Sequence, residues 1–374
     1  MADRQGENVS LVVVGAGNIG SHVGRHLARM PEVNRLMLID KDCYEEKNLR
    51  SQDILASDCG KPKAVVQARQ VRRIRPDLEV EALTVPVQEV PLGKLRSTVI
   101  LACLDTKAAR QCVNEAAWHL GIPWIDSGVA ADGLLARVNM YVPSADAPCL
   151  ECAWDRRDYE LLEQSYPCDP SAVTNRPAGR LAGTHPTNAP SSLGALAAAL
   201  QVIELQKLLA CSPGLLPAGR EVTIDALHHK QRVTAYRRNP QCRFDHKVWR
   251  LEQLDRPVSA LTVGDFVDGA VADRAPSNSA SLSAAGRPFV RRLTCPRCGA
   301  ARDLLRLAGR VPGPLRRCRE CEHDMVARGF DLMPRLEHAA VGRALARRKL
   351  TSLGFRAGDV VTVQDDRVER HFLL

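Results

Sequence analysis

The chain has no uninterrupted apolar run long enough to cross a membrane. A transmembrane helix needs about 20 mostly apolar residues, and the most apolar stretch, residues 191–210, is interrupted by Gln201, Glu204, Gln206 and Lys207. The N-terminus also lacks a basic region followed by the apolar core of a signal peptide. These absences argue against membrane insertion and secretion. We expect a cytoplasmic protein in which residues 191–210 form a mostly buried helix.

Aromatic residues are scarce, at 4% of the 374 residues, yet 45% of the chain is hydrophobic, which is typical of a globular protein. The net charge of +9 comes from basic residues scattered along the chain and not from one block. This charge favours acidic partners, and a nucleotide, a nucleic acid or an acidic protein would all qualify. Nucleic-acid binding is the least favoured of the functional hypotheses. Cysteine is plentiful, at 13 residues. In a reducing compartment, C-x-x-C pairs are more often metal sites than disulfides.

Short β-branched runs alternate with helical patterns over the first 130 residues. Residues 9–15 suit a buried parallel strand, and residues 18–30 change to helical spacing. The alternation continues up to Pro143, and residues 220–238 later alternate like a hairpin that returns to the sheet. This order predicts an α/β fold with a Rossmann-like, doubly wound sheet.

Composition divides the chain into four parts. Residues 1–250 carry the α/β pattern, and residues 251–289, rich in Ala, Ser, Pro and Gly towards their end, are predicted to be a linker. Residues 290–325 contain four cysteines, and residues 326–374 form a small C-terminal module. The last residues of that module alternate like a β-hairpin, so we expect a β-rich tail.

The stretch VVVGAGNIG places Gly15, Gly17 and Gly20 in a G-x-G-x-x-G pattern between a strand and a helix. Such glycines permit a tight turn and a close approach of the backbone to phosphate, while the helix N-terminus supplies about half a positive charge. Asp40 closes the next strand 20 residues after Gly20, where a carboxylate bonds a ribose hydroxyl. The pattern predicts a nucleotide site and, taken alone, favours a dinucleotide oxidoreductase.

The segment after the second strand argues against a dehydrogenase. Polar and charged side chains crowd it: Asp42, Asn48, Arg50, Gln52, Lys61 and Lys63. Several cations and amides suit a triphosphate better than a pyrophosphate that backbone already holds. Asp105 ends a further strand, at the edge where open α/β sheets bind ligands. A carboxylate beside phosphates indicates Mg²⁺.

In this order the motifs resemble the ubiquitin-activating (E1-like) superfamily, whose bacterial members are the ThiF/MoeB/HesA-type adenylyltransferases. The motifs are G-x-G-x-x-G, I-D-x-D, N-L-x-x-Q, D-x-G-K-P-K-A and C-x-D with a downstream arginine, and they span roughly residues 9–245. The resemblance implies that ATP and Mg²⁺ activate the C-terminal glycine of a ubiquitin-like or sulfur-carrier protein as an acyl adenylate. It implies that Asp40 holds the ribose, that Asn48, Gln52 and Lys63 contact the phosphates, and that Asp105 binds Mg²⁺. The other residues expected at the nucleotide are Gly15, Gly17, Gly20 and Asp42.

Two departures from the family pattern concern positive charges. The family usually reads N-L-x-R-Q, whereas here Ser51 stands at the arginine position and Arg50 comes one residue earlier. Arg50, or a cation from elsewhere such as Lys61, would then serve catalysis beside Lys63 and Asp105. Family members often have a longer N-terminal segment that lends an arginine to the second subunit of a dimer. The resemblance therefore implies a homodimer, although only Arg4 is available for that role in this sequence.

Cys149 and Cys152 form half of a tetrahedral zinc site, because two thiolates at this spacing can bind one ion. The family often completes the site with a second pair near the end of the domain. The corresponding segment here offers Cys242 and His246, which predicts a Cys3His site. The alternative is a set of unrelated reduced cysteines.

A second set follows the spacing C-x2-C-x19-C-x2-C, and its members are Cys295, Cys298, Cys318 and Cys321. This spacing is typical of a zinc ribbon. A structural zinc ion supplies about 10–16 kcal/mol of binding free energy, enough to fold a unit with little core. A redox-active dithiol is the alternative. Ribbons occur in nucleic-acid binders and in protein-docking modules alike, so the spacing does not name a partner.

Cys168, in the stretch EQSYPCDP, belongs to neither set. The superfamily places its thioester or persulfide cysteine between the first zinc pair and the next long helix, and Cys168 is the one cysteine in that interval of the sequence. The resemblance therefore implies a nucleophile. A zinc ligand and an incidental thiol are the alternatives.

The leading hypothesis is an enzyme that adenylates a ubiquitin-like protein and transfers it to Cys168. In this hypothesis the ribbon and the C-terminal module dock the carrier or a conjugating (E2-like) enzyme. The second hypothesis is a sulfur-carrier-protein adenylyltransferase without a thioester. The third is an inactive E1-like regulatory subunit, although Lys63 and Asp105 both argue against it.

Overall fold

The structure is a computed structural model, and it describes residues 8–164, 189–210, 218–268, 280–366 and 368–374. Its contacts divide the chain into two compact units. The first comprises Met1–Val90, Leu95–Tyr159 and Arg180–Trp249. The second comprises Pro91–Lys94, Glu160–Gly179 and Arg250–Leu374.

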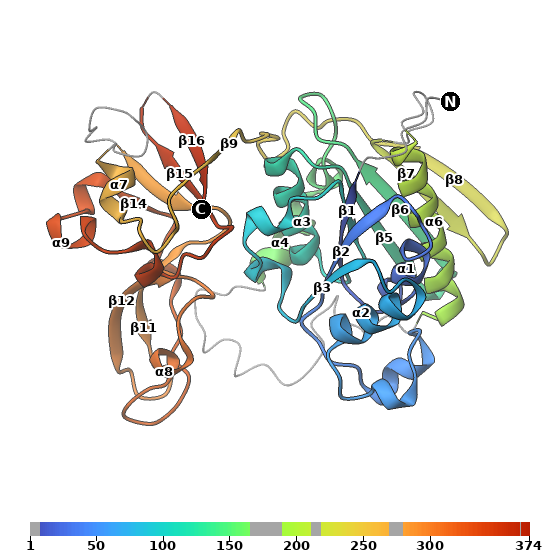
Figure 1. Cartoon of the computed structure of the whole chain (residues 1–374), viewed down its shortest axis with the longest axis horizontal. Coiled ribbons are helices and arrows are strands. Elements are labelled where there is room, and N and C mark those ends of the chain that lie inside the picture. The colour runs from blue at the N-terminus through green and yellow to red at the C-terminus, as the bar shows by residue number, and fades with distance from the viewer. Residues whose placement is uncertain (1–7, 165–188, 211–217, 269–279, 367) are drawn as a thin grey trace. The chain divides into compact units, whose positions relative to one another are not determined.

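One large mixed sheet forms the first unit (Figure 1). Its strands are β1 (Val9–Val14), β2 (Val33–Ile39), β3 (Glu79–Leu83), β4 (Val99–Ala102), β5 (Trp124–Ala130), β6 (Leu135–Tyr141), β7 (Arg220–Asp225) and β8 (Lys230–Ala235). Their spatial order is β3-β2-β1-β4-β5-β6-β7-β8. β1 to β5 run parallel, and β6 to β8 add antiparallel pairs. The predicted α/β fold with a Rossmann-like sheet is confirmed.

Helices cover both faces of this sheet (Figure 1). They are α1 (Gly20–Leu27), α2 (Lys63–Ile74), α3 (Lys107–Leu120) and α6 (Ser191–Leu209). A further helix, α4 (Arg156–Gln164), includes residues of both units. Alternate strand residues point to one face, and Leu11 and Val13 of β1 pack there in one core with α1, α2 and α6. α3 covers the other face and ends at Gly121, whose φ of 66° is the left-handed conformation that terminates helices.

Of the helices described, α6 alone is long and apolar enough by composition to cross a membrane. It packs against α1, β5 and β6, as a core helix does. Its Gln201 is fully buried and donates hydrogen bonds to the carbonyl oxygens of Ala102 and Ile125 at 3.1 and 2.8 Å. α6 is the buried helix predicted over residues 191–210.

The second unit contains two small sheets. Its strands are β9 (Leu251–Gln253), β10 (Ser281–Ala284), β11 (Phe289–Thr294), β12 (Ala301–Leu307), β13 (Leu332–Met333), β14 (Arg335–Glu337), β15 (Val360–Gln364) and β16 (Glu369–Leu373). Its helices are α7 (Val263–Val267), α8 (Gly313–Arg316) and α9 (Arg343–Ala346). The sheet orders are β14-β10-β15-β16-β9 and β12-β11-β13.

Two segments of this unit can be compared with their sequence-based predictions. The segment 251–289, for which the sequence predicts a linker, contributes β9, α7 and β10 to the unit. The predicted terminal hairpin is present, because β15 and β16 pair antiparallel from Val360 opposite Leu373 to Gln364 opposite Glu369.

Candidate functional site

The conformation of the loop between β1 and α1 depends on its glycines. Gly15 has a positive φ of 95°, and a Cβ there would lie 2.4 Å from the carbonyl oxygen of Cys103. A Cβ on Gly20 would lie 1.9 Å from the carbonyl oxygen of Gly15. Beside Gly17, by contrast, the described chain places nothing within 4 Å of the Cβ position. The fold of the loop therefore requires Gly15 and Gly20, while the space beside Gly17 is open.

Asp40, at the end of β2, is tied to this loop. Its Oδ2 accepts a hydrogen bond from the Ala16 amide at 2.6 Å, and its Oδ1 accepts one from the Asp42 amide at 2.8 Å. Burial raises the pKa of Asp40, and the two N–H donors oppose that rise. The residue assigned to the ribose from the sequence thus also fixes the backbone of the glycine loop.

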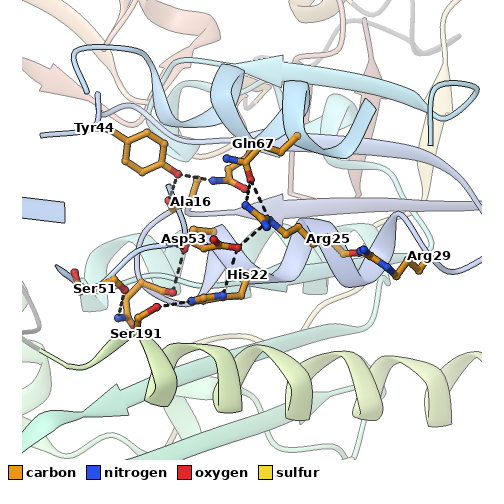
Figure 2. A network of polar contacts seen from close by, with 12 residues as sticks. Ala16, His22, Arg25, Arg29, Tyr44, Ser51, Asp53, Gln67 and Ser191 are labelled. Atoms are coloured by element: carbon orange, nitrogen blue, oxygen red, sulfur yellow. Dashed lines mark hydrogen bonds and ion pairs between the residues drawn. The ribbon is translucent and has the colours of Figure 1, made fainter. Parts of the chain in front are cut away.

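Tyr44 lies behind the glycine loop, and the sequence analysis missed it. Its hydroxyl donates a hydrogen bond to the Ala16 carbonyl at 2.8 Å and accepts one from Gln67 Nε2 at 2.9 Å (Figure 2). The Lys63 ammonium lies 5.7 Å from the centre of the Tyr44 ring, and its charge lowers the pKa of Asp40. The structure therefore brings the first residue of α2 and the glycine loop together around one buried tyrosine.

The phosphate-side residues predicted from the sequence lie in and after a single turn, Glu46–Arg50. Asn48 is buried, and its Oδ1 accepts a hydrogen bond from the Glu45 amide at 2.9 Å, so this carboxamide shapes the turn. Arg50 is exposed. The side-chain oxygen of Gln52 is buried without a hydrogen-bond partner in the described part of the chain. This oxygen is an acceptor, so a water or a ligand hydroxyl would satisfy it, whereas a phosphate would bond the N–H groups of the Gln52 amide.

Asn18 links three separate segments, and no local pattern in the sequence marks these contacts. Its Nδ2 donates to the carbonyl oxygens of Ser51 and Ala189 at 2.6 and 3.0 Å. The space for its side chain exists because Gly194 follows on α6, where a Cβ would lie 2.2 Å from Asn18 Oδ1. The position of Ser51, where the family has an arginine, is thereby fixed from the glycine loop.

Figure 2 shows a second set of contacts around His22 of α1. Asp53 pairs with Arg25 at 2.8 Å and lies 3.7 Å from the His22 ring. The other ring nitrogen of His22 lies 3.2 Å from the Ser191 hydroxyl. Burial lowers the pKa of His22, with the Arg25 charge acting in the same direction and Asp53 against it. His22 therefore packs between α6 and the phosphate-side loop.

Asp105 follows β4 at the carboxyl edge of the parallel strands and is exposed. The Cys103 amide donates to the Val14 carbonyl at 2.8 Å, which places this strand end directly beside the glycine loop. Burial raises the pKa of the Cys103 thiol to about 12, so this cysteine is protonated at neutral pH and is a core thiol. The end of β4, which leads into Asp105, therefore lies beside the glycine loop.

The first predicted metal set is gathered in the structure. The ligand atoms of Cys149, Cys152, Cys242 and His246 all lie within 4.8 Å of one another. Cys149 Sγ lies 3.8 Å from Cys152 Sγ and 3.7 Å from Cys242 Sγ. Sulfur ligands of one tetrahedral zinc ion lie about 3.8 Å apart. The second ring nitrogen of His246 faces the Phe244 carbonyl at 2.8 Å, a partner that orients metal-binding histidines.

The second set is gathered as well. The ligand atoms of Cys295, Cys298, Cys318 and Cys321 lie within 4.8 Å of one another, with Sγ–Sγ distances of 3.4 to 3.6 Å. Each pair lies on a tight turn, since the Gly299 amide donates to the Cys295 carbonyl and the Glu322 amide to the Cys318 carbonyl. Four thiolates in this arrangement fit a structural zinc ion.

Cys168, predicted as a nucleophile from the resemblance, lies outside the described residues. Arg4 lies outside them as well. The residues that the structure adds to the site are Asn18, Tyr44, Asp53 and Gln67. Their signal in the sequence is faint, because polar residues in a charged loop are ordinary and only the folded chain brings them to the glycine loop.

Several relatives are similar to part of this chain. A sulfur carrier protein adenylyltransferase of Thermus thermophilus is 30% identical over 241 residues, covering 63% of this chain and 82% of that protein. The SAMP-activating enzyme E1 of Haloferax volcanii is 28% identical over 235 residues, covering 62% and 78%. Ubiquitin-like modifier-activating enzyme 5 of Oryza sativa is 29% identical over 159 residues, covering 38% of this chain and 37% of that protein. The chain thus spans well under half the length of this last relative.

Among solved structures, E. coli MccB with ATP aligns with a TM-score of 0.48 at 22% identity, covering 63% of this chain and 66% of that chain. The ThiF family profile matches residues 4–244, which is more than half of the sequence. The resemblance predicted from the motifs is confirmed, and the chain belongs to the ThiF family.

Proposed function

We propose that this protein uses ATP to adenylate the C-terminal carboxylate of a ubiquitin-like or sulfur-carrier protein. The observation that carries the proposal is the convergence of the glycine loop, Asp40, Lys63 and Asp105 at the carboxyl ends of β1, β2 and β4. Relatives in the ThiF family whose names state an adenylyltransferase or E1 activity support it.

In this function the glycine loop receives the phosphates through its backbone N–H groups, with open space beside Gly17. Asp40 holds the ribose, and Asn48, Gln52 and Lys63 face the phosphates. Asp105 holds Mg²⁺, which neutralises phosphate charge when it is bound. A carboxylate oxygen of the carrier attacks the α-phosphorus, pyrophosphate leaves, and an acyl adenylate forms.

The reaction brings a carboxylate against a polyanion, so positive charge and alignment supply most of the acceleration. Lys63 provides one cation. Ser51 cannot provide the second, and we assign it to Arg50, which precedes Ser51 and is exposed. Lys61, also exposed, is the alternative source.

The step after adenylation divides two functions. In the first, the Cys168 thiolate attacks the acyl carbon, AMP leaves, and a thioester forms, as in an E1 enzyme. In the second, the adenylate passes to a sulfur pathway without a thioester. The names of the relatives support both, since ubiquitin-like activating enzymes and sulfur-carrier adenylyltransferases match alike.

A pair of measurements tests the proposal. The protein is incubated with ATP, Mg²⁺ and candidate carriers, and pyrophosphate exchange is measured beside non-reducing gels. Exchange with a thiol-sensitive adduct that is absent in C168A supports the E1 function, and exchange without an adduct supports the sulfur-carrier function. Absence of exchange with every carrier, together with tight binding to an active homologue, would instead identify a regulatory subunit. Gel filtration measures the proposed homodimer.

A further inference from the structure

Side chains from three elements hold the segment that carries Asp105. Gln201 of α6 and the Ser127 hydroxyl of β5 both donate hydrogen bonds to the Ala102 carbonyl, each at 3.1 Å. Arg110 of α3 turns back towards the strand end, and its Nη2 donates to the carbonyl of Leu104 at 2.5 Å. Leu104 directly precedes Asp105, so Arg110 fixes the peptide that leads into that carboxylate.

A fully buried carboxylate determines where the Arg110 guanidinium lies. Asp126 of β5 is 0% exposed, and its Oδ1 lies 3.0 Å from Arg110 Nε. A buried charge is strongly unfavourable unless it is paired, so Asp126 holds the guanidinium in place. The guanidinium is a rigid planar fork. Its Nε contacts Asp126, while its Nη2 donates hydrogen bonds to the Leu104 carbonyl and, at 3.3 Å, to the Ser127 carbonyl.

Arg137 of β6 offers a natural comparison. Its Nη1 lies 3.4 Å from Asp126 Oδ2 and 3.5 Å from Glu221, so it pairs with the same carboxylate. Gly128 leaves room for both guanidinium groups, since a Cβ there would lie 2.9 Å from Arg137 Nε and 3.3 Å from Arg110 Nη2. Unlike Arg110, Arg137 has its described polar contacts with carboxylates and not with the Asp105 segment.

We propose that Arg110, anchored by Asp126, is a positioning residue that orients Asp105 towards Mg²⁺. The inference rests on the proposed function, in which Asp105 holds the metal ion. Arg110 acts only through the backbone, because its contacts are to Asp126 and to two carbonyl oxygens. Partners that orient a metal-binding side chain typically change metal affinity by about 10–100-fold when they are removed.

The test measures how Mg²⁺ promotes binding of a fluorescent ATP analogue to the wild-type protein, R110Q, R137Q, D105N and the double variant D105N/R110Q. We expect R110Q to need about 10–100-fold more Mg²⁺ for half-maximal binding, and R137Q to match the wild type. In EDTA, R110Q and the wild type should bind the analogue equally. The double variant should be no worse than D105N, since both changes act on one ligand.

Equal shifts in R110Q and R137Q would overturn the inference, because loss of an Asp126 partner would then explain both. Additive effects in the double variant would also overturn it. R110K, which keeps the charge but not the fork, replaces R110Q if that variant fails to fold. A wild-type protein that binds the analogue without any dependence on Mg²⁺ would refute the proposed function itself, whereas a Mg²⁺-dependent wild type with an unchanged R110Q refutes only this inference.

Discussion

Alanine substitutions in the glycine loop should separate folding from nucleotide binding. At Gly15, alanine adopts a left-handed conformation that costs about 1–2 kcal/mol. Its Cβ would also lie 2.4 Å from the Cys103 carbonyl oxygen, an overlap of the kind that costs about 1–3 kcal/mol when the backbone must shift. We therefore expect G15A to lose about 2–5 kcal/mol, a large part of the stability of a typical domain of about 5–15 kcal/mol.

Gly17 should behave in the opposite way. Its Cβ position is free of described atoms within 4 Å, so G17A should change the free energy of unfolding by no more than about 0.5 kcal/mol. The added methyl group occupies the space that we assign to the phosphates, and overpacking of about 1–3 kcal/mol corresponds to a loss of ATP affinity of about 5- to 150-fold.

Tryptophan fluorescence reports the unfolding of the first unit selectively, because all four tryptophans belong to that unit. They are at positions 118, 124, 154 and 249. Urea unfolding followed by this signal gives the stabilities, and calorimetry gives ATP affinity. The reasoning is refuted if G17A loses as much stability as G15A, or if G17A binds ATP as tightly as the wild type.

Two further predictions concern metal and pH. Elemental analysis should find two zinc ions per chain, and the C152S and C298S variants should each lose one of them. C298S should leave the unfolding transition measured by tryptophan fluorescence unchanged. Equal metal content in the wild type and both variants would contradict the two clusters. The folded-state pKa of Cys103, about 12 against an ordinary value of 9.0, makes the folded state the stronger proton binder between those values. Its contribution to stability is complete below about pH 9 and is lost as pH rises towards 12, by at most about 1.4 kcal/mol per pH unit. C103A should remove this part of the alkaline slope, and an unchanged slope would count against the burial of the thiol.

The sequence identified the parts of the site that depend on local spacing. The glycine loop, Asp40 and Asp105 were predicted from strand ends and fixed intervals, and local spacing also indicated the C-x2-C pairs of both metal sets. Cys242 and His246, about 90 residues after Cys149 and Cys152, were predicted from the family resemblance, and the structure gathers all four. Long-range contacts escaped it. Asn18 reaches Ala189, 171 residues away, and no local pattern marks such a pair. The segment 251–289 has a linker-like composition, yet β9 pairs with β16 more than a hundred residues later, and strand pairing over that separation is not visible in the composition.

The central claim is that a carrier's C-terminal carboxylate attacks the α-phosphorus of ATP. A carrier whose terminal glycine carries heavy oxygen in its carboxylate tests this most directly. After adenylation and cleavage of the acyl bond, the bridging oxygen stays with the nucleotide, so mass spectrometry should find heavy oxygen in AMP and none in pyrophosphate. AMP without the label, or nucleotide cleavage that proceeds equally with a carrier whose C-terminus is amidated, would contradict the account.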